Sequence, residues 1–298
     1  MTAEVLAEYG GSARAVQYHY DVGREFYQLW LDAGLTYSCA LWDLDDPRDT
    51  LERAQQRKID FHLEASRALT AGAVLDVGCG WGALLSEISR RGRARRLVGL
   101  TLSEDQASYV RGLQLPCSEV RLESWTHHQP AEAYDSIVSV GAFEHFARPE
   151  DTVAQKIEVY RDFFSRCAGW LSPQGRMSLQ SIAYGTMRRE EASAFINNEI
   201  FPSADLPTLG EIVQAAEGIF EIVLVRNDRL HYAKTFSAWA ENLRRRRLEA
   251  VRLAREDVTK RYERYLTQSS VGFLMGKIGL LRLVLRPVER KWPVLATP

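Results

Sequence analysis

The sequence contains few cysteines, and none of them are arranged in pairs. Its 298 residues include four cysteines, Cys39, Cys79, Cys117 and Cys167, which are far apart and form no CxxC motif. Structural zinc sites and disulfide frameworks need closely spaced or paired cysteines. The pattern therefore argues against both kinds of protein and favours the reducing cytoplasm as the location.

The sequence also lacks a membrane-spanning segment and an excess of either charge. Lys277 and Arg282 interrupt the longest apolar stretch, which leaves it shorter than the roughly 20 residues of a spanning helix. The segment Met1–Gly10 carries Glu4 and Glu8 and has no apolar core, so we expect no secretory signal. The formal net charge is −1, and this balance argues against a protein that binds nucleic acid.

What the sequence does contain is a regular alternation of short apolar runs and helical stretches. Hydrophobic residues make up 46% and charged residues 26% of the chain, a composition typical of globular proteins. The predicted strands are Ala73–Val77, Leu97–Leu102, Glu119–Leu122, Ser136–Val140, Arg176–Ile182 and Glu221–Val225, and the predicted helices lie near Ala83–Arg91, Glu104–Leu113 and Val153–Trp170. This alternation predicts an α/β fold with a mostly parallel sheet and helices on both faces.

We expect a single domain over residues 1–298 with four parts. They are a helical N-terminal cap (1–70), a cofactor-binding core (71–183), a lid insertion (184–215) and the remaining core with a C-terminal helix and strand (216–298). A helix of the cap is predicted to begin near Thr50, and the insertion is polar and carries Pro202 and Pro207. The last part contains a long charged stretch, Phe236–Gln268, which predicts one helix, and an apolar run, Leu280–Leu285, which predicts a closing strand.

Three glycines at alternate positions follow the first predicted strand. Gly78, Gly80 and Gly82 precede a helix, and the carboxyl end of a strand in an open α/β sheet is where nucleotides bind. An NAD site also needs an acidic residue near the end of the second strand, but the first one there is Glu104. The GxGxG spacing instead favours a nucleoside with an amino-acid tail, and Asp76 is expected to organise the loop.

These glycines stand among further sequence blocks that together resemble one known family. The blocks are Tyr18–Asp21 (YHYD), Thr36–Cys39 (TYSC), Asp76–Gly82 (DVGCGWG), Gly99–Ser103 (GLTLS), Ser139–Phe146 (SVGAFEHF), Glu199–Pro202 (EIFP) and His231–Thr235 (HYAKT). In this order they resemble the S-adenosylmethionine (SAM)-dependent methyltransferases of the cyclopropane fatty acid synthase and mycolic acid cyclopropane synthase type. The resemblance covers nearly the whole chain and implies a class I methyltransferase (Rossmann-like) fold.

The resemblance also implies SAM as the cofactor and assigns residues to its binding. Beside Asp76, these residues are Tyr37, Ser38, Gly78, Gly80, Gly82, Thr101, Leu102, Gln106 and Trp125. The glycines match residues along the amino-acid and ribose portions of SAM, and Trp125 matches an aromatic residue that covers the adenine. Thr126 stands where the family has an acidic residue beside that tryptophan.

The substrate of the resembled family is an alkene, which is a weak carbon nucleophile. Its attack on the SAM methyl group leaves a carbocation, which aromatic rings stabilise, and a base must then remove a proton. In the family that base is proposed to be a bound bicarbonate. The resemblance places Glu144, Tyr232, Gln180, Cys39 and Tyr20 at this catalytic site, with Gln180 where many members have histidine. Glutamine still donates a hydrogen bond but carries no positive charge.

Each candidate residue also has a purely structural alternative. Glu144 is a plausible helix cap, Tyr20 and Tyr232 are plausible core aromatics, and Cys39 is plausible as a small buried side chain. The pair His127–His128 has no further metal ligands at suitable spacing, so we predict no metal site. The run Arg244–Arg247 is expected to be a solvated face, with attraction to an anionic membrane or to a phosphorylated substrate as the alternative.

The predicted function is SAM-dependent C-methylation of a hydrophobic, alkene-containing substrate, giving a cyclopropane or a methyl branch in a lipid or isoprenoid. The alternative is a small-molecule C- or N-methyltransferase of specialised metabolism, for example one that acts on an isoprenoid diphosphate. A third hypothesis is a SAM-binding module that has lost catalysis. The sequence leaves the substrate and the oligomeric state open.

Overall fold

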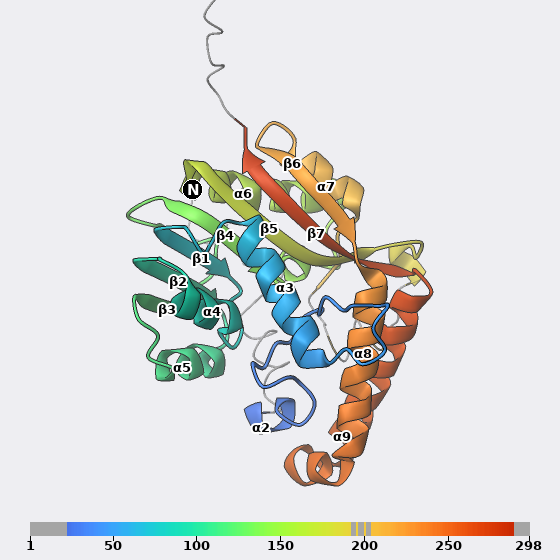
Figure 1. Ribbon diagram of the computed structural model, residues 1–298. Helices are drawn as coiled ribbons and strands as arrows, with labels where there is room; N and C mark the ends of the chain where they lie inside the picture. Colours follow the sequence, from blue (N-terminus) through green and yellow to red (C-terminus); the bar gives the residue numbers. More distant parts are fainter. Residues whose placement is uncertain (1–22, 192–194, 196–199, 201–203, 289–298) are drawn as a thin grey trace, which may run out of the picture.

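In the part of the chain that the structure describes, seven β-strands form one sheet in the order β3-β2-β1-β4-β5-β7-β6 (Figure 1). The computed structural model describes residues 23–191, 195, 200 and 204–288. The strands are β1 (Ala73–Val77), β2 (Arg96–Thr101), β3 (Ser118–Leu122), β4 (Tyr134–Val140), β5 (Leu171–Tyr184), β6 (Phe220–Asn227) and β7 (Ile278–Pro287). The pairs among β1 to β5 are parallel, whereas β7 runs antiparallel to both β5 and β6. The prediction of a mostly parallel sheet is therefore confirmed.

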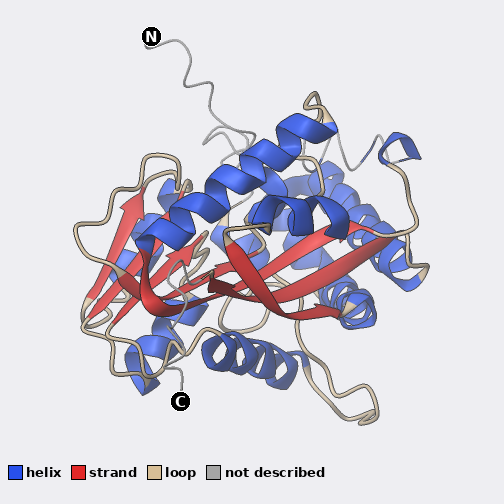
Figure 2. Cartoon of the chain, turned by 90° about the horizontal axis from the view of Figure 1, so that it is seen from above, coloured by secondary structure: helices blue, strands red, loops and turns tan. Residues whose placement is uncertain are grey.

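Helices cover both faces of this sheet (Figure 2). The helices of the described residues are α2 (Arg24–Tyr27), α3 (Leu51–Ala65), α4 (Ala83–Arg91), α5 (Glu104–Gly112), α6 (Val153–Trp170), α7 (Leu209–Ala216), α8 (Arg229–Arg245) and α9 (Arg247–Leu274), with 3₁₀ turns η1 (Phe143–His145) and η2 (Arg189–Glu191). Successive strand residues point to opposite faces. Val74 accordingly packs in a cluster with Leu85 of α4, whereas Leu75 packs in a cluster with Phe163 of α6. Helices α3 to α5 thus cover one face, and α6 and α7 the other.

Hydroxyl side chains define where several helices begin. The Thr50 side chain accepts a hydrogen bond from the Arg53 amide, so α3 begins at Leu51, as the sequence predicts. Thr152 and Thr208 each form a reciprocal capping box at the start of α6 and α7. Each cap satisfies amides that have no partner within the helix, and is worth about 1 kcal/mol.

The prediction of a single long helix over residues 236–268 is wrong. The chain instead breaks at Arg246, where φ is −109° and ψ is 24°, and again within α9 at Arg255, where φ is 70° and ψ is 165°. Helices α8 and α9 pack against each other (Figure 1), and Trp239 of α8 and Leu266 of α9 are buried in one cluster. Both helices carry an apolar face, and the breaks at Arg246 and Arg255 let these faces bury one another, which a continuous helix does not allow.

The strand predicted over 176–182 is longer than expected, because β5 extends to Tyr184 and pairs with β7 along Met177–Tyr184. The predicted closing strand over 280–285 is confirmed within β7. The predicted lid, residues 184–215, thus begins at the last residue of β5, and its last residues belong to α7, which packs on α6. Its role as a lid stays a prediction.

A buried acidic residue anchors the end of this insertion next to α6. The Asp205 carboxylate lies 2.8 Å from Lys156 Nζ and 3.2 Å from Arg189 Nε. It also accepts a hydrogen bond of 2.8 Å from the Tyr184 hydroxyl. Because Lys156 and Asp205 are both buried, these contacts fix the neighbouring Leu206 against the rest of the protein.

Candidate active site

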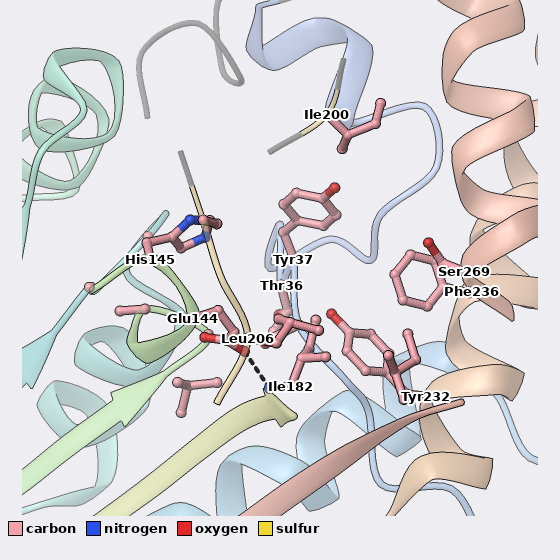
Figure 3. A pocket seen from close by; sticks show the side chains of 18 of the residues that line it. Thr36, Tyr37, Glu144, His145, Ile182, Ile200, Leu206, Tyr232, Phe236 and Ser269 are labelled. Carbon is pink, nitrogen blue, oxygen red and sulfur yellow. Dashed lines mark hydrogen bonds between the residues drawn. The ribbon is translucent and has the colours of Figure 1, made fainter. Parts of the chain in front are cut away.

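A cavity of about 660 Å³ lies at the carboxyl edge of the parallel strands. Its walls come from the glycine loop after β1, the ends of β2 and β4, the loop before α3, the insertion after β5, and helices α8 and α9. Figure 3 shows Glu144 and His145 on one side of this cavity and Tyr232, Phe236 and Ser269 on the other. The cavity therefore joins the predicted cofactor site to the predicted catalytic site.

The three glycines of the loop have different structural roles. All have positive φ angles, and a Cβ atom on Gly78 would lie 2.6 Å from the Cβ of Ala142, so glycine is required there. Gly78 and Gly80 line the cavity, and no atom lies within 4 Å of a Cβ built on Gly80. Gly82 does not line it, and a Cβ there would lie 2.9 Å from Val110 of α5. Gly82 thus allows close helix packing, and its role in cofactor binding stays a prediction.

Most of the other residues predicted to bind the cofactor also lie around the cavity. Tyr37, Ser38, Asp76, Thr101, Leu102, Gln106 and Trp125 all line it. The Thr101 hydroxyl donates a 2.7 Å hydrogen bond to Oε1 of Gln106, which fixes the two side chains together at the end of β2. Sequence blocks that are far apart in the chain thus meet at one site.

Asp76 is a buried carboxylate inside this wall. Neither of its oxygens has a hydrogen-bond partner among the described residues. Burial raises the pKa of Asp76 from 3.8 to about 7, because the charged form loses its hydration. An unpartnered carboxylate beside a glycine loop suits a ligand with an ammonium or hydroxyl donor, and SAM carries both.

Lys58 of α3 is a site residue that the sequence analysis did not identify. It lines the cavity, and its ammonium donates a 3.0 Å hydrogen bond to the Ser38 hydroxyl. Burial lowers the pKa of Lys58 from 10.5 to about 8. The signal was present in the sequence, since Lys58 stands among the apolar positions Leu51, Ala54 and Leu63 of α3, where a lysine is rarely buried without a partner.

Glu144 lies in the 3₁₀ turn η1 that follows β4. Its Oε1 accepts a 2.6 Å hydrogen bond from the backbone amide of Ile182, which Figure 3 marks with a dashed line. Oε2 is buried and has no hydrogen-bond partner among the described residues. Burial raises the pKa of Glu144 from 4.5 to about 7. A carboxyl group of this kind exchanges a proton near neutral pH, which is what general acid–base catalysis needs.

Aromatic side chains line the cavity opposite Glu144. The ring of Tyr232 packs 4.6 Å from that of Phe236, measured between ring centroids. The Tyr37 hydroxyl donates a 2.9 Å hydrogen bond to the Tyr265 hydroxyl. All four residues line the cavity, and their electron-rich faces favour a nearby positive charge.

Two predicted catalytic residues lie behind the cavity wall. Cys39 and Gln180 do not line the cavity, although both are buried. Burial raises the pKa of the Cys39 thiol to about 12, so it is not an activated nucleophile. Tyr20 lies outside the described residues. The catalytic roles of these three residues stay predictions.

The remaining polar candidates have structural partners. His128 is buried, and its Nε2 lies 3.1 Å from the Tyr134 hydroxyl. Within the described part of the chain, no group of three or more His, Cys, Asp or Glu residues is arranged to hold a metal ion. Arg245, Arg246 and Arg247 form ion pairs with glutamates, which is the solvated face that the sequence predicts. No helix among the described residues is both long and apolar enough to cross a membrane.

Together, the sheet order, the glycine loop at the end of β1 and the unpartnered Asp76 define a class I SAM-dependent methyltransferase. The family model for mycolic acid cyclopropane synthetase matches residues 9–283. Cyclopropane mycolic acid synthase 3 of Mycobacterium tuberculosis is 34% identical, over 93% of this chain and 96% of its own length. Cyclopropane mycolic acid synthase MmaA2 of the same organism is 36% identical, over 91% and 96%.

The three-dimensional comparison agrees with these matches. The crystal structure of mycolic acid cyclopropane synthase CmaA1 with SAH and CTAB is 34% identical and has a TM-score of 0.81, covering 92% of this chain and 97% of that one. The chain therefore belongs to the mycolic acid cyclopropane synthetase family.

Proposed function

We propose that this protein transfers the methyl group of SAM to a carbon–carbon double bond in a lipid chain and forms a cyclopropane or a methyl branch. The observation that carries the proposal is the position of Glu144, which is buried with a pKa of about 7 and lies across one cavity from Tyr232 and Phe236. Relatives named for cyclopropane synthesis on mycolic acids support the choice of an alkene.

When SAM is bound, it supplies an electrophilic methyl group. The chain's own residues supply alignment, exclusion of water and control of charge. Asp76 would accept hydrogen bonds from the amino-acid end of SAM, and Lys58 would pair with its carboxylate. The rings of Tyr232, Phe236 and Tyr37 stabilise positive charge on the substrate carbon, by about 0.5–2 kcal/mol for each ring. Exclusion of water from the cavity keeps that cation from being captured by water as an alcohol.

Glu144 then controls the proton that leaves the substrate. We propose that it does so together with a bound bicarbonate, as the family resemblance implies. The raised pKa favours a protonated Glu144, which can donate a hydrogen bond to an anion that a charged carboxylate would repel. The Tyr232 hydroxyl is the second donor. Gln180 is not needed as a direct ligand in this arrangement, since its side chain lies outside the cavity lining.

The test is an assay of the purified protein with SAM and substrates of three classes: cis-unsaturated phospholipid vesicles, unsaturated acyl thioesters and isoprenoid diphosphates. We expect a lipid product that is one CH₂ heavier, with a cyclopropane or methyl-branch signal in its proton NMR spectrum. Glu144→Ala should abolish the product while SAM still binds. Methylation on nitrogen, or turnover only with the diphosphate, would replace this proposal with the small-molecule alternative.

The role of bicarbonate needs a separate measurement. In carbon dioxide-free buffer the rate should fall, and added bicarbonate should restore it. A rate that does not depend on bicarbonate would leave Glu144 as the direct base and would remove bicarbonate from the mechanism.

A further inference from the structure

A fully buried arginine, Arg282 of β7, lies behind the catalytic wall. Its Nε donates a 2.9 Å hydrogen bond to Oε1 of Gln180. Its Nη2 donates to the backbone carbonyl oxygens of Cys39 at 3.1 Å and Ala40 at 3.4 Å, and its Nη1 forms an ion pair with Asp228. Since the side chain is 0% exposed, these groups replace water completely around the guanidinium.

The contact with Arg282 fixes the orientation of the Gln180 amide. Guanidinium groups only donate hydrogen bonds, so the oxygen end of the amide must face Arg282. The same oxygen lies 3.3 Å from Nε2 of His62, and Nδ1 of that ring lies 2.8 Å from the Ser178 hydroxyl. Burial, and then the charge of Arg282, lower the pKa of His62. The neutral ring is thus a second donor to Gln180, and the amide cannot flip.

The partners of Arg282 lie next to the residues of the catalytic wall. Asp228 precedes α8, and its carbonyl oxygen accepts a 3.3 Å hydrogen bond from the amide of Tyr232, one turn later. Gln180 lies two residues before Ile182 on β5, and the Ile182 amide holds Glu144. One guanidinium therefore connects the strand that holds Glu144 with the helix that carries Tyr232.

The loop before α3 has separate anchors on its two halves. Residues 36–38 line the cavity, and α3 holds them: Gln55 donates to the carbonyl oxygens of Thr36 and Ser38, and Lys58 donates to the Ser38 hydroxyl. The next two carbonyl groups are the ones held by Arg282. Residues 36–38 of this loop are thus fixed by Gln55 and Lys58 of α3, whereas residues 39 and 40 are fixed by Arg282.

We propose that Arg282 is a positioning residue of the methyl-transfer site, which fixes Gln180, the Cys39–Ala40 backbone and the start of α8 relative to one another. The inference rests on the proposed function for its chemistry, but the anchoring is testable without it. Arginine suits this role because its planar fork reaches partners on three sides, which the ammonium group of lysine cannot match. Cys39 and Gln180 then contribute to the site through their positions rather than by contact with the substrate.

The experiment compares Arg282→Lys, Arg282→Gln and the double variant Arg282→Gln/Asp228→Asn, in which no unpaired charge is buried. The matched control is Arg286→Gln, because Arg286 lies on the same strand, is exposed and pairs with Glu221. Three quantities are measured on each variant: the Kd for SAM, the kcat and product distribution with the lipid substrate, and hydrogen–deuterium exchange.

We expect kcat to fall about 100-fold in the glutamine variants, because a displacement of about 1 Å is enough for such a loss. The Kd for SAM should stay unchanged, and rearranged or hydroxylated products should increase because the base is misplaced. Arg282→Lys should recover part of kcat, and Arg286→Gln should behave as wild type. If kcat is retained, or if kcat and SAM affinity fall in parallel with the folded fraction, Arg282 has no positioning role.

Hydrogen exchange separates this inference from the proposed function. Loss of the anchor should accelerate amide exchange in residues 39–42 and 229–235, with no change in the glycine loop at 78–82. Unchanged exchange in the first two segments would overturn the anchoring. If the wild-type protein methylates no alkene, the proposed function fails, and the exchange data still decide whether Arg282 fixes these segments.

Discussion

Replacing Glu144 by glutamine should stabilise the ligand-free protein at alkaline pH while it destroys activity. Burial raises the pKa of Glu144 from 4.5 to about 7. A carboxyl group whose pKa is raised by folding favours the folded state at low pH, and this contribution is lost as the pH rises through 7. The full difference corresponds to about 3 kcal/mol, since one pKa unit is worth about 1.36 kcal/mol. Glutamine has nearly the same size and does not ionise, so it avoids this loss.

The measurement is urea-induced unfolding of wild type and Glu144→Gln at about pH 5.5 and about pH 8.5. The stability of the variant relative to wild type should increase by about 2 kcal/mol between these two conditions, because part of the effect has already occurred at the lower pH. Glu158→Gln on the exposed face of α6 is the control and should show no such change. A relative stability of Glu144→Gln that is independent of pH, or that falls as the pH rises, would refute the electrostatic reasoning. Turnover should fall at least about 100-fold, because glutamine cannot take up or release the proton that Glu144 exchanges near neutral pH.

Three other substitutions test the cofactor site, and one labelling reaction tests the reactivity of the cysteines. Gly80→Ala should weaken SAM binding in calorimetry and lower the free energy of unfolding by about 1 kcal/mol, because alanine is strained at its positive φ. Gly82→Ala has the same strain and should lower the free energy of unfolding further, by about 1–3 kcal/mol, through overpacking against α5; equal losses of stability would contradict their different roles. Asp76→Asn should weaken SAM binding about 10-fold or more at pH 8, as expected for loss of a charge-assisted hydrogen bond, and unchanged affinity would show that Asp76 does not contact the ligand. Iodoacetamide should modify exposed Cys117 and leave buried Cys39 unmodified when the folded protein is analysed by mass spectrometry; fast labelling of Cys39 would contradict its raised pKa.

The sequence predicts the sheet and its flanking helices well because their signals are local. The strands β1 and β4 are short apolar runs, and Thr50 and Thr152 are local caps that set where α3 and α6 begin. The breaks at Arg246 and Arg255 have no such signal, because they arise from the packing of α8 against the later residues of α9, which meet only once the chain turns back. Antiparallel pairing of β7 between β5 and β6 is likewise decided by tertiary contacts.

The site shows the same division between local and long-range information. Motif positions such as Gly78 and Trp125 reach the cavity because short segments place them at strand ends. Whether a side chain at such an end points into the cavity or away from it depends on the neighbouring strands, and for this reason Gln180 lies outside the lining. Lys58 and Arg282 could be recognised only as charges within apolar segments, since their partners are supplied by distant elements.

The charges buried around the cavity indicate that cofactor binding and protonation are coupled. Burial raises the pKa of Asp76 to about 7 and lowers the pKa of Lys58 to about 8. A cation bound beside Asp76 favours the charged carboxylate, so the pKa of Asp76 falls and protons are released. SAM carries a sulfonium charge and SAH does not. The two ligands should therefore differ in the number of protons released on binding near pH 7.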